Sequence, residues 1–110
     1  TDSAPNPTEV AQAALASCIS VGIQAIATHR GVTLTKIAID IESDIDISAV
    51  WGVGDTDEAK RTGVSDVRVI VDLEGDADRE TLDQIQRDAV KWSPVVNTYT
   101  RPANFTSELA

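Results

Sequence analysis

Residues 6–31 read NPTEVAQAALASCISVGIQAIATHRG, and this stretch decides the fold. Asn6 can cap a helix that starts at the following proline, and Glu9 lies at the spacing of a capping box. Gly31 can adopt the left-handed conformation that ends a helix. Between these signals almost every residue is apolar or small. We therefore predict one helix over residues 7–30 that is apolar, and therefore buried, on all sides.

Two strands are predicted after this helix. Residues 32–47 alternate isoleucines with polar residues, and residues 67–74 alternate valines with polar residues, which is the period of a half-buried strand. Residues 48–66 contain three glycines, form a loop between the strands and could line a site. Acidic residues of the first strand could bind a metal, but a row on a flat strand more simply indicates a solvated face. These residues are Asp40, Glu42, Asp44 and Asp46.

The second half of the chain predicts two further helices and a strand. A helix over residues 79–91 has Asp78 as its N-cap. Ser93 and Pro94 then give the start signal of a short third helix, and residues 104–109 (NFTSEL) alternate as a final strand. The apolar stripe of the second helix consists of Leu82, Ile85, Ala89 and Trp92. Three strands cannot cover a helix that is apolar on every side, so this chain alone is short of sheet.

Composition limits the class of protein. A chain of 110 residues suits one domain, and its 18 acidic against 9 basic residues argue against nucleic acid or an anionic membrane as partner. No apolar run reaches the ~18 residues of a spanning helix, and no signal segment is present. The single cysteine gives neither a disulfide framework nor a metal set. We therefore expect a cytoplasmic protein without metal or cofactor. The chain opens TDSAPNP and contains no methionine, so we also expect a processed or partial chain.

Three features together resemble one known family. They are NPTEVAQAALASC at residues 6–18, the paired strands, and SPV at residues 93–95 before a short terminal strand. They resemble osmotically inducible protein C (OsmC) and organic hydroperoxide resistance protein (Ohr). The resemblance implies an α+β fold in which two protomers interlock and bury their long central helices against antiparallel sheet. Members usually carry a strand hairpin before this helix. Residues 1–110 therefore correspond to a single domain that is the C-terminal part of the family fold.

The resemblance also implies peroxidase chemistry. In that branch of the family a helix cysteine attacks a hydroperoxide, and a second cysteine resolves the sulfenic acid as a disulfide. Cys18 matches the attacking cysteine, whereas Ser93 stands at the position of the resolving one. An assisting glutamate near the start of the helix falls on Thr8, with Glu9 beside it. The implied substrate is a small organic hydroperoxide.

A thiolate needs a nearby cation or hydrogen-bond donor. The family's arginine lies in strands that this sequence lacks, and Arg30 and Arg101 are its candidate substitutes. Cys18 is mid-helix, so its own helix dipole gives no help. The hydroxyl of Ser93, or the amides after Pro94, could donate instead. A sulfenic acid at Cys18 would need an external thiol, because serine cannot form a disulfide.

Hydrolysis in the same interface pocket is an alternative, with Cys18, Ser93, Glu9 and His29 as parts. His29 lies about three helical turns from Cys18, so it would have to come from a partner protomer. Alternatively, Cys18 is a small buried hydrophobe without chemistry.

Two further interpretations stay open. Processing could expose Thr1 as an N-terminal nucleophile whose own amine is the base. The chain could also be a non-catalytic subunit that completes a partner's sheet, either in a homo-oligomer or with a second polypeptide that supplies the N-terminal strands. Three aromatic side chains could line an apolar pocket for a small substrate or pack as core and loop residues: Trp51, Trp92 and Tyr99.

Overall fold

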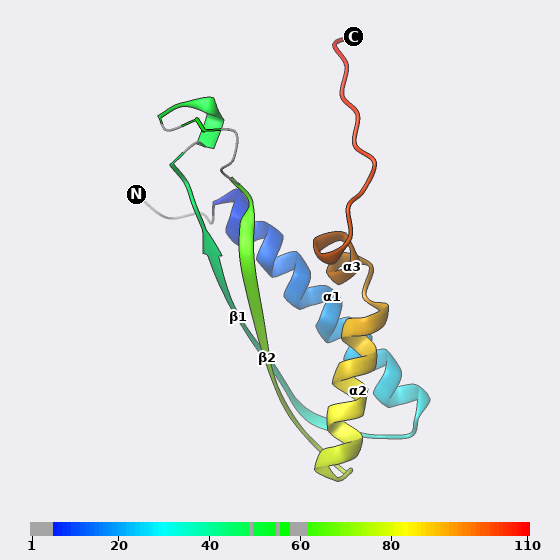
Figure 1. Cartoon of the computed structure of the whole chain (residues 1–110). Helices are drawn as coiled ribbons and strands as arrows, with labels where there is room; N and C mark the ends of the chain where they lie inside the picture. The colour runs from blue at the N-terminus through cyan, green and yellow to red at the C-terminus, as the bar shows by residue number, and fades with distance from the viewer. Residues whose placement is uncertain (1–5, 49, 55, 58–61) are drawn as a thin grey trace.

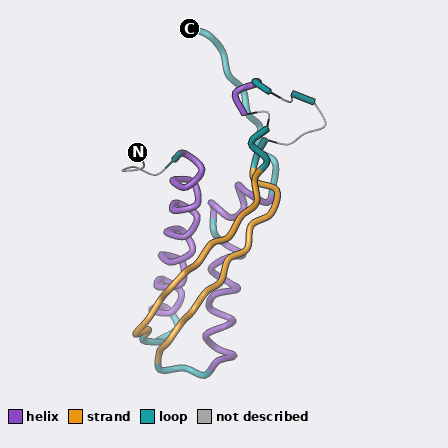
Figure 2. Tube along the Cα trace, turned by 90° about the vertical axis from the view of Figure 1, so that its left-hand side faces the viewer, coloured by secondary structure: helices purple, strands orange, loops and turns teal. Residues whose placement is uncertain are grey.

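The computed structural model describes residues 6–48, 50–54, 56–57 and 62–110. Two long helices lie on one face of a β-hairpin, and a short third helix crosses near one end of them (Figures 1 and 2). In chain order the elements are α1 (Pro7–His29), β1 (Leu34–Ile45), a 3₁₀ turn (Val50–Gly52), β2 (Val64–Gly75), α2 (Arg79–Trp92) and α3 (Pro94–Thr100). This is the α+β class that the sequence predicts.

Both ends of α1 form as the sequence predicts. The amide of Glu9 donates to Oδ1 of Asn6 at 2.9 Å, and the amide of Asn6 donates to Oε2 of Glu9 at 3.4 Å, which completes a capping box. At the other end Arg30 caps the helix, and Gly31 has φ +73°. The left-handed glycine turns the chain from α1 towards β1.

α1 has one buried side and one exposed apolar side, so the prediction that it is buried all round is wrong for the single chain. Its buried residues recur every fourth position and form the core with α2: Leu15, Ile19, Ile23 and Ala27. On the opposite side, Val10 is 53% and Val21 is 66% exposed. One side of α1 stays exposed because the hairpin and α2 pack against its other side only.

α1 is also long and apolar enough to cross a membrane, judged by length and composition alone. The prediction that no segment reaches this limit is therefore wrong. A helix that forms the core of a globular domain passes the same test. In this chain Ile19 and Ile23 of α1 have no exposed surface and pack in that core.

The hairpin is antiparallel, and its two faces differ in polarity. Three apolar pairs lie directly opposite each other and pack towards the helices: Ile37 with Leu73, Ile39 with Val71, and Ile41 with Val69. On the outer face Arg68 pairs with Glu42, and Lys36 pairs with Asp72 at 2.6 Å. Within the described residues no three acidic, His or Cys side chains gather as a metal site. Asp40, Glu42 and Asp44 are exposed, so the acidic row of β1 forms a solvated face.

At the open end of the hairpin, the last residue of β2 has to be glycine. A Cβ on Gly75 would lie 2.6 Å from the carbonyl oxygen of Thr33, closer than a side chain can be placed. At the other end β2 begins at Val64, three residues before the predicted start. The extra residues belong to the pairing with β1, where Ile45 lies opposite Val64.

α2 and α3 begin at the predicted caps. Oδ1 of Asp78 accepts the amide of Thr81 at 2.8 Å, and Ile85 and Ala89 are buried against α1. The two helices cross closely at Gly22, where an added Cβ would lie 3.4 Å from Cβ of Ala89, at van der Waals contact. The prediction that Trp92 belongs to the buried stripe is wrong, since this side chain is 71% exposed.

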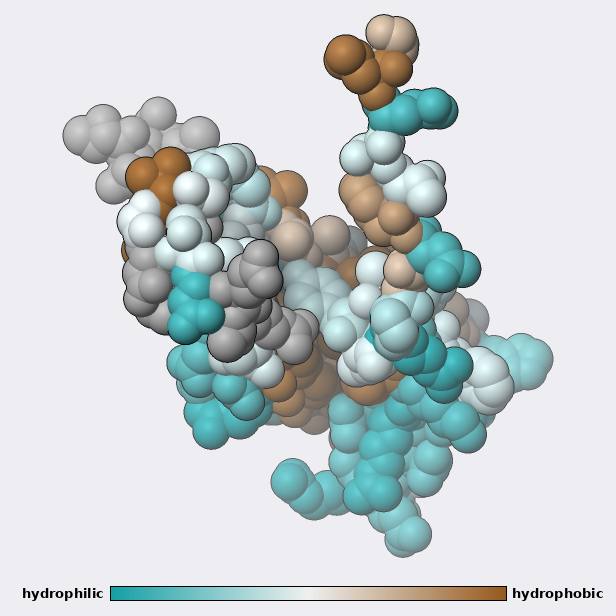
Figure 3. Space-filling view, turned by 45° about the horizontal axis from the view of Figure 1, so that its top comes forward, coloured by the Kyte–Doolittle hydropathy of each residue, from teal (hydrophilic) through white to brown (hydrophobic). Residues whose placement is uncertain are grey.

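The predicted final strand is also wrong for the single chain. Residues 104–109 are exposed and have no strand partner in the part of the chain that the structure describes, with Phe105 88% and Leu109 99% exposed. The segment leaves the body of the molecule and ends in apolar atoms (Figures 1 and 3). In the loop predicted over residues 48–66, the described part contains Trp51, which is 89% exposed.

Candidate functional site

The start of α3 brings Ser93 against Cys18. Ser93 follows α2 and caps α3, and its hydroxyl oxygen accepts the amide of Val96 at 3.2 Å. The same hydroxyl lies 3.0 Å from Sγ of Cys18 and donates to it. Ser93 is 3% exposed, so this contact is largely shielded from water. The predicted hydroxyl donor to the sulfur is therefore present.

The hydroxyl group of Ser93 both donates a hydrogen bond and accepts one. A serine hydroxyl has one proton to donate and lone pairs that accept. Because Val96 donates to the lone pair, the proton of Ser93 is free to point at the sulfur. The sulfur of Cys18 therefore has a hydrogen-bond donor in the hydroxyl of Ser93. Cys18 is a half-buried free thiol in the middle of α1.

Asn97 holds the start of α3 in place. Its side-chain amide donates to the carbonyl of Ser93 at 2.8 Å and to that of Lys91 at 3.1 Å. These bonds join the last turn of α2 to the first turn of α3 around Ser93. Sequence reasoning missed this residue. An asparagine four residues after a helix cap could have indicated it, because such a side chain reaches back one turn.

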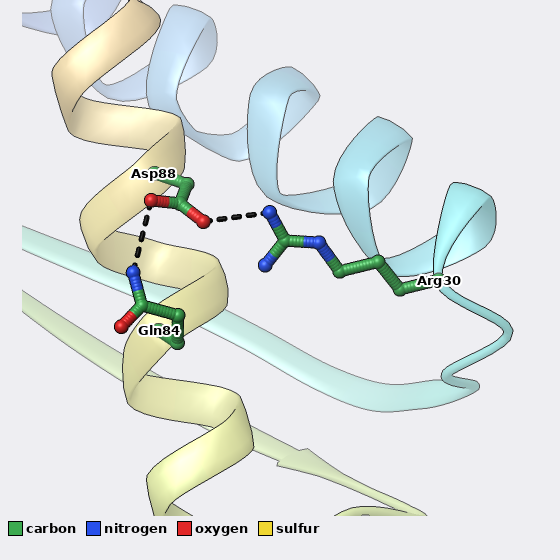
Figure 4. Close-up of polar contacts among 3 residues, drawn as sticks. All are labelled: Arg30, Gln84 and Asp88. Atoms are coloured by element: carbon green, nitrogen blue, oxygen red, sulfur yellow. Dashed lines mark hydrogen bonds and ion pairs between the residues drawn. The ribbon is translucent and has the colours of Figure 1, made fainter.

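Arg30 does not lie near the sulfur. It follows α1, twelve residues or about 18 Å along the helix from Cys18. Its guanidinium donates to Oδ2 of Asp88 at 2.6 Å, and Nε2 of Gln84 donates to the other oxygen at 3.0 Å (Figure 4). The hydrogen bonds from Arg30 first, and from Gln84 second, lower the pKa of Asp88. Arg30 thus ties the end of α1 to α2.

Comparison with known proteins agrees with this architecture. The model of one family, described as OsmC-like protein, matches residues 1–108. The chain belongs to the OsmC-like protein family. No curated protein matches this sequence.

The other predicted site residues of this OsmC-like chain lie apart from the sulfur. Glu9 is used in the helix cap, nine residues or about 14 Å along α1 from Cys18. Thr8 is in the same first turn. His29 is exposed at the opposite end of α1. Thr1 lies outside the described residues.

The basic and aromatic side chains near α3 do not form a pocket around Cys18 either. Arg101 is exposed where α3 ends. Lys91 lies 5.2 Å above the exposed ring of Trp92. Tyr99 packs against the core as a half-buried side chain. Across residues 6–48, 50–54, 56–57 and 62–110, no cationic side chain hydrogen-bonds to Cys18.

An open groove of the OsmC-like chain lies away from Cys18. It has a volume of about 940 Å³ and runs between residues 68–73 of β2 and the first two turns of α2. Neither Cys18 nor Ser93 lines it. A substrate pocket at the sulfur would therefore need walls that the described part of this chain does not provide.

Proposed function

We propose that this OsmC-like chain reduces small organic hydroperoxides by single-cysteine thiol chemistry. The observation that carries the proposal is the 3.0 Å contact between the hydroxyl of Ser93 and the sulfur of Cys18. It supplies a donor to a thiolate at the position where the peroxidase branch of the family has its nucleophile. Family membership supports the same chemistry at the coarser level.

In the first step the thiolate of Cys18 attacks the terminal oxygen of a hydroperoxide ROOH. An S–O bond forms and the O–O bond breaks, so the sulfur is oxidised to sulfenic acid and the substrate leaves as alkoxide. The alkoxide takes a proton from solvent and becomes the alcohol ROH. Two electrons pass from sulfur to the peroxide, and no metal is needed for the balance.

In the second step an external thiol R′SH reduces the sulfenic acid. It forms a mixed disulfide with Cys18 and releases water, and a second R′SH then displaces R′S–SR′ and restores the thiol. Ser93 stands where an internal resolving thiol would be, and a hydroxyl cannot take that role. The reductant is therefore a small thiol that reaches the site from solvent.

We propose further that the working form is an oligomer, either of this chain or with a second polypeptide that supplies N-terminal strands. The exposed apolar side of α1, with Val10 and Val21, supports this proposal. A sheet of two strands also supports it, because such a sheet is marginal alone. A second chain over Cys18 would provide the missing walls of a pocket for an apolar substrate.

Consumption of cumene hydroperoxide with dithiothreitol as reductant tests the proposal. We expect the parent chain to consume the peroxide and Cys18→Ser to lose this activity. Ser20→Ala, a half-buried neighbour on α1, serves as the matched control and should keep it. Equal rates for the parent and Cys18→Ser would contradict the proposal. Turnover of a p-nitrophenyl ester that depends on Cys18, without peroxide turnover, would favour the hydrolase alternative.

A further inference from the structure

Ser93 is the single residue between α2 and α3, and it ends one helix and caps the other. Its backbone is extended, with φ −70° and ψ 121°, so the chain changes direction at this residue. A rotation about these two angles would change the angle between the helices and move the hydroxyl that donates to Cys18. The contact with the sulfur therefore depends on what holds α3 against α2.

Apolar packing constrains α3 weakly. Among the seven residues of this helix, all of which the structure describes, none is buried. Val95, Val96 and Tyr99 pack against the core but stay partly exposed. A helix of two turns is also too short to be stable by itself. The position of α3 therefore depends in part on the polar bonds at its first turn.

Asn97 bridges the junction between the two helices with its side-chain amide. Nδ2 donates to the carbonyl oxygen of Ser93 at 2.8 Å and to that of Lys91 at 3.1 Å. Lys91 lies in the last turn of α2, where backbone carbonyls have no partner within the helix. The backbone amide of Asn97 also donates to the carbonyl of Ser93, at 3.0 Å. One residue of α3 thus supplies three hydrogen bonds to Ser93 and the end of α2.

The two side-chain bonds require a group that donates twice. The amide nitrogen of asparagine carries two hydrogens, one for each carbonyl, whereas the amide oxygen would face two carbonyl oxygens and be repelled. Aspartate and leucine are similar in size to asparagine, but neither has a donor to offer at this position. Both bonds end on backbone carbonyls, so they do not depend on which side chain residue 93 carries.

We propose that Asn97 is a positioning residue for the thiol chemistry of Cys18, an inference that rests on the proposed function. It holds the angle between α2 and α3, and this angle keeps the hydroxyl of Ser93 3.0 Å from the sulfur. Asn97 acts through Ser93 and takes no part in the transfer of oxygen or electrons. Its removal should therefore slow the oxidation of Cys18 only while the hydroxyl of Ser93 is present.

The disulfide of Ser93→Cys measures this geometry without peroxide. In a glutathione buffer, the disulfide with Cys18 forms as one glutathione disulfide is reduced to two thiols, so the oxidised fraction gives the effective concentration of the two sulfurs. We expect Asn97→Leu and Asn97→Asp in this background each to lower it by about tenfold, the effect of one or two lost hydrogen bonds. Thr98→Val is the matched control, because it removes a side-chain bond of the same helix that ends on Pro94. An unchanged value in both Asn97 variants, or an equal loss in the control, would overturn the proposal.

Stopped-flow oxidation of Cys18 by cumene hydroperoxide tests whether Asn97 acts through Ser93. We expect Asn97→Leu to slow the reaction by about three- to tenfold, and its combination with Ser93→Ala to be no slower than Ser93→Ala alone. A merely structural role would slow both backgrounds alike, and that result would overturn the proposal. A parent chain whose Cys18 does not react would contradict the proposed function instead, and the disulfide measurement would then decide the role of Asn97.

Discussion

The hydroxyl of Ser93 donates to the sulfur of Cys18 across 3.0 Å, and these two residues come from positions 75 apart in the chain. The contact depends on a cap, because Ser93 is fixed by accepting the amide of Val96 and by its place between α2 and α3. It also depends on α1, whose Leu15 and Ile19 anchor the turns beside Cys18 in the core. The N-cap of α3, Ser93, is thus the hydrogen-bond partner of the thiol on α1.

Ser93→Cys should restore an internal disulfide. A disulfide needs two sulfurs about 2.0 Å apart, and the present side chains already approach within hydrogen-bond distance. We expect one equivalent of hydroperoxide to join Cys18 to the introduced thiol in this variant, which intact mass shows as the loss of two hydrogens.

Thr98→Cys is the matched control, because it places a second thiol on the exposed side of the same helix. In that variant both thiols should remain available to a maleimide after the sulfenic acid is reduced. Free thiols in oxidised Ser93→Cys would show that the two positions do not meet as described.

Ser93→Ala should slow the reaction of Cys18 with hydroperoxide and destabilise the fold. Removal of a serine N-cap costs about 1 kcal/mol, and the thiolate also loses its donor. Asp78→Ala removes the cap of α2, which lies away from the thiol, and separates the two effects. We expect similar losses in urea denaturation for both variants but slower oxidation of Cys18 only for Ser93→Ala, measured by stopped-flow. Equal oxidation rates would exclude a role of the hydroxyl in the chemistry.

The ion pair between Arg30 and Asp88 should give the fold a pH dependence on the acid side. The pKa of Asp88 is lowered in the folded chain, so its stabilising effect is present above the unfolded pKa and is lost as pH falls through the folded one. We expect part of the stability to disappear below about pH 4. Asp88→Asn and Arg30→Gln should each reduce stability at pH 7 and flatten this acid limb, and the double variant should add little. Additive losses at pH 7 would show that the pair does not act as a unit.

The two sides of α1 should respond differently to truncation. Ile19 has no exposed surface, so Ile19→Ala should lower the free energy of unfolding by about 2–5 kcal/mol. Val21 is 66% exposed in the single chain, so Val21→Ala should cost less than about 0.5 kcal/mol. Chemical denaturation at concentrations where the chain is monomeric measures both. A large loss for Val21→Ala under those conditions would mean that α1 is covered within one chain.

Local signals predicted most of the elements. Caps at Asn6, Asp78 and Ser93 correctly predicted where the three helices begin, because capping is decided by neighbours in sequence. The end of α3 at Thr100 was not predicted. The alternation of β1 and β2 likewise predicted a hairpin with one apolar face. The contact of Ser93 with Cys18 followed from the family resemblance, since two positions 75 residues apart have no local signal that joins them.

The errors concern burial, which depends on what lies across from a side chain. Trp92 fits the apolar stripe of α2 by spacing, yet its side chain is 71% exposed. Residues 104–109 alternate as a strand does, but a strand also needs an edge within reach. The bond from Asn97 back to Ser93 is local, whereas its bond to Lys91 depends on the angle between α2 and α3, which the sequence does not specify.

Intact mass of the purified chain, before and after one equivalent of cumene hydroperoxide, tests the central claim most directly. We predict a rapid gain of one oxygen, located on Cys18 by peptide mapping, that dithiothreitol reverses and Cys18→Ser abolishes. A thiol that remains unoxidised under these conditions would contradict single-cysteine peroxidase chemistry in this chain.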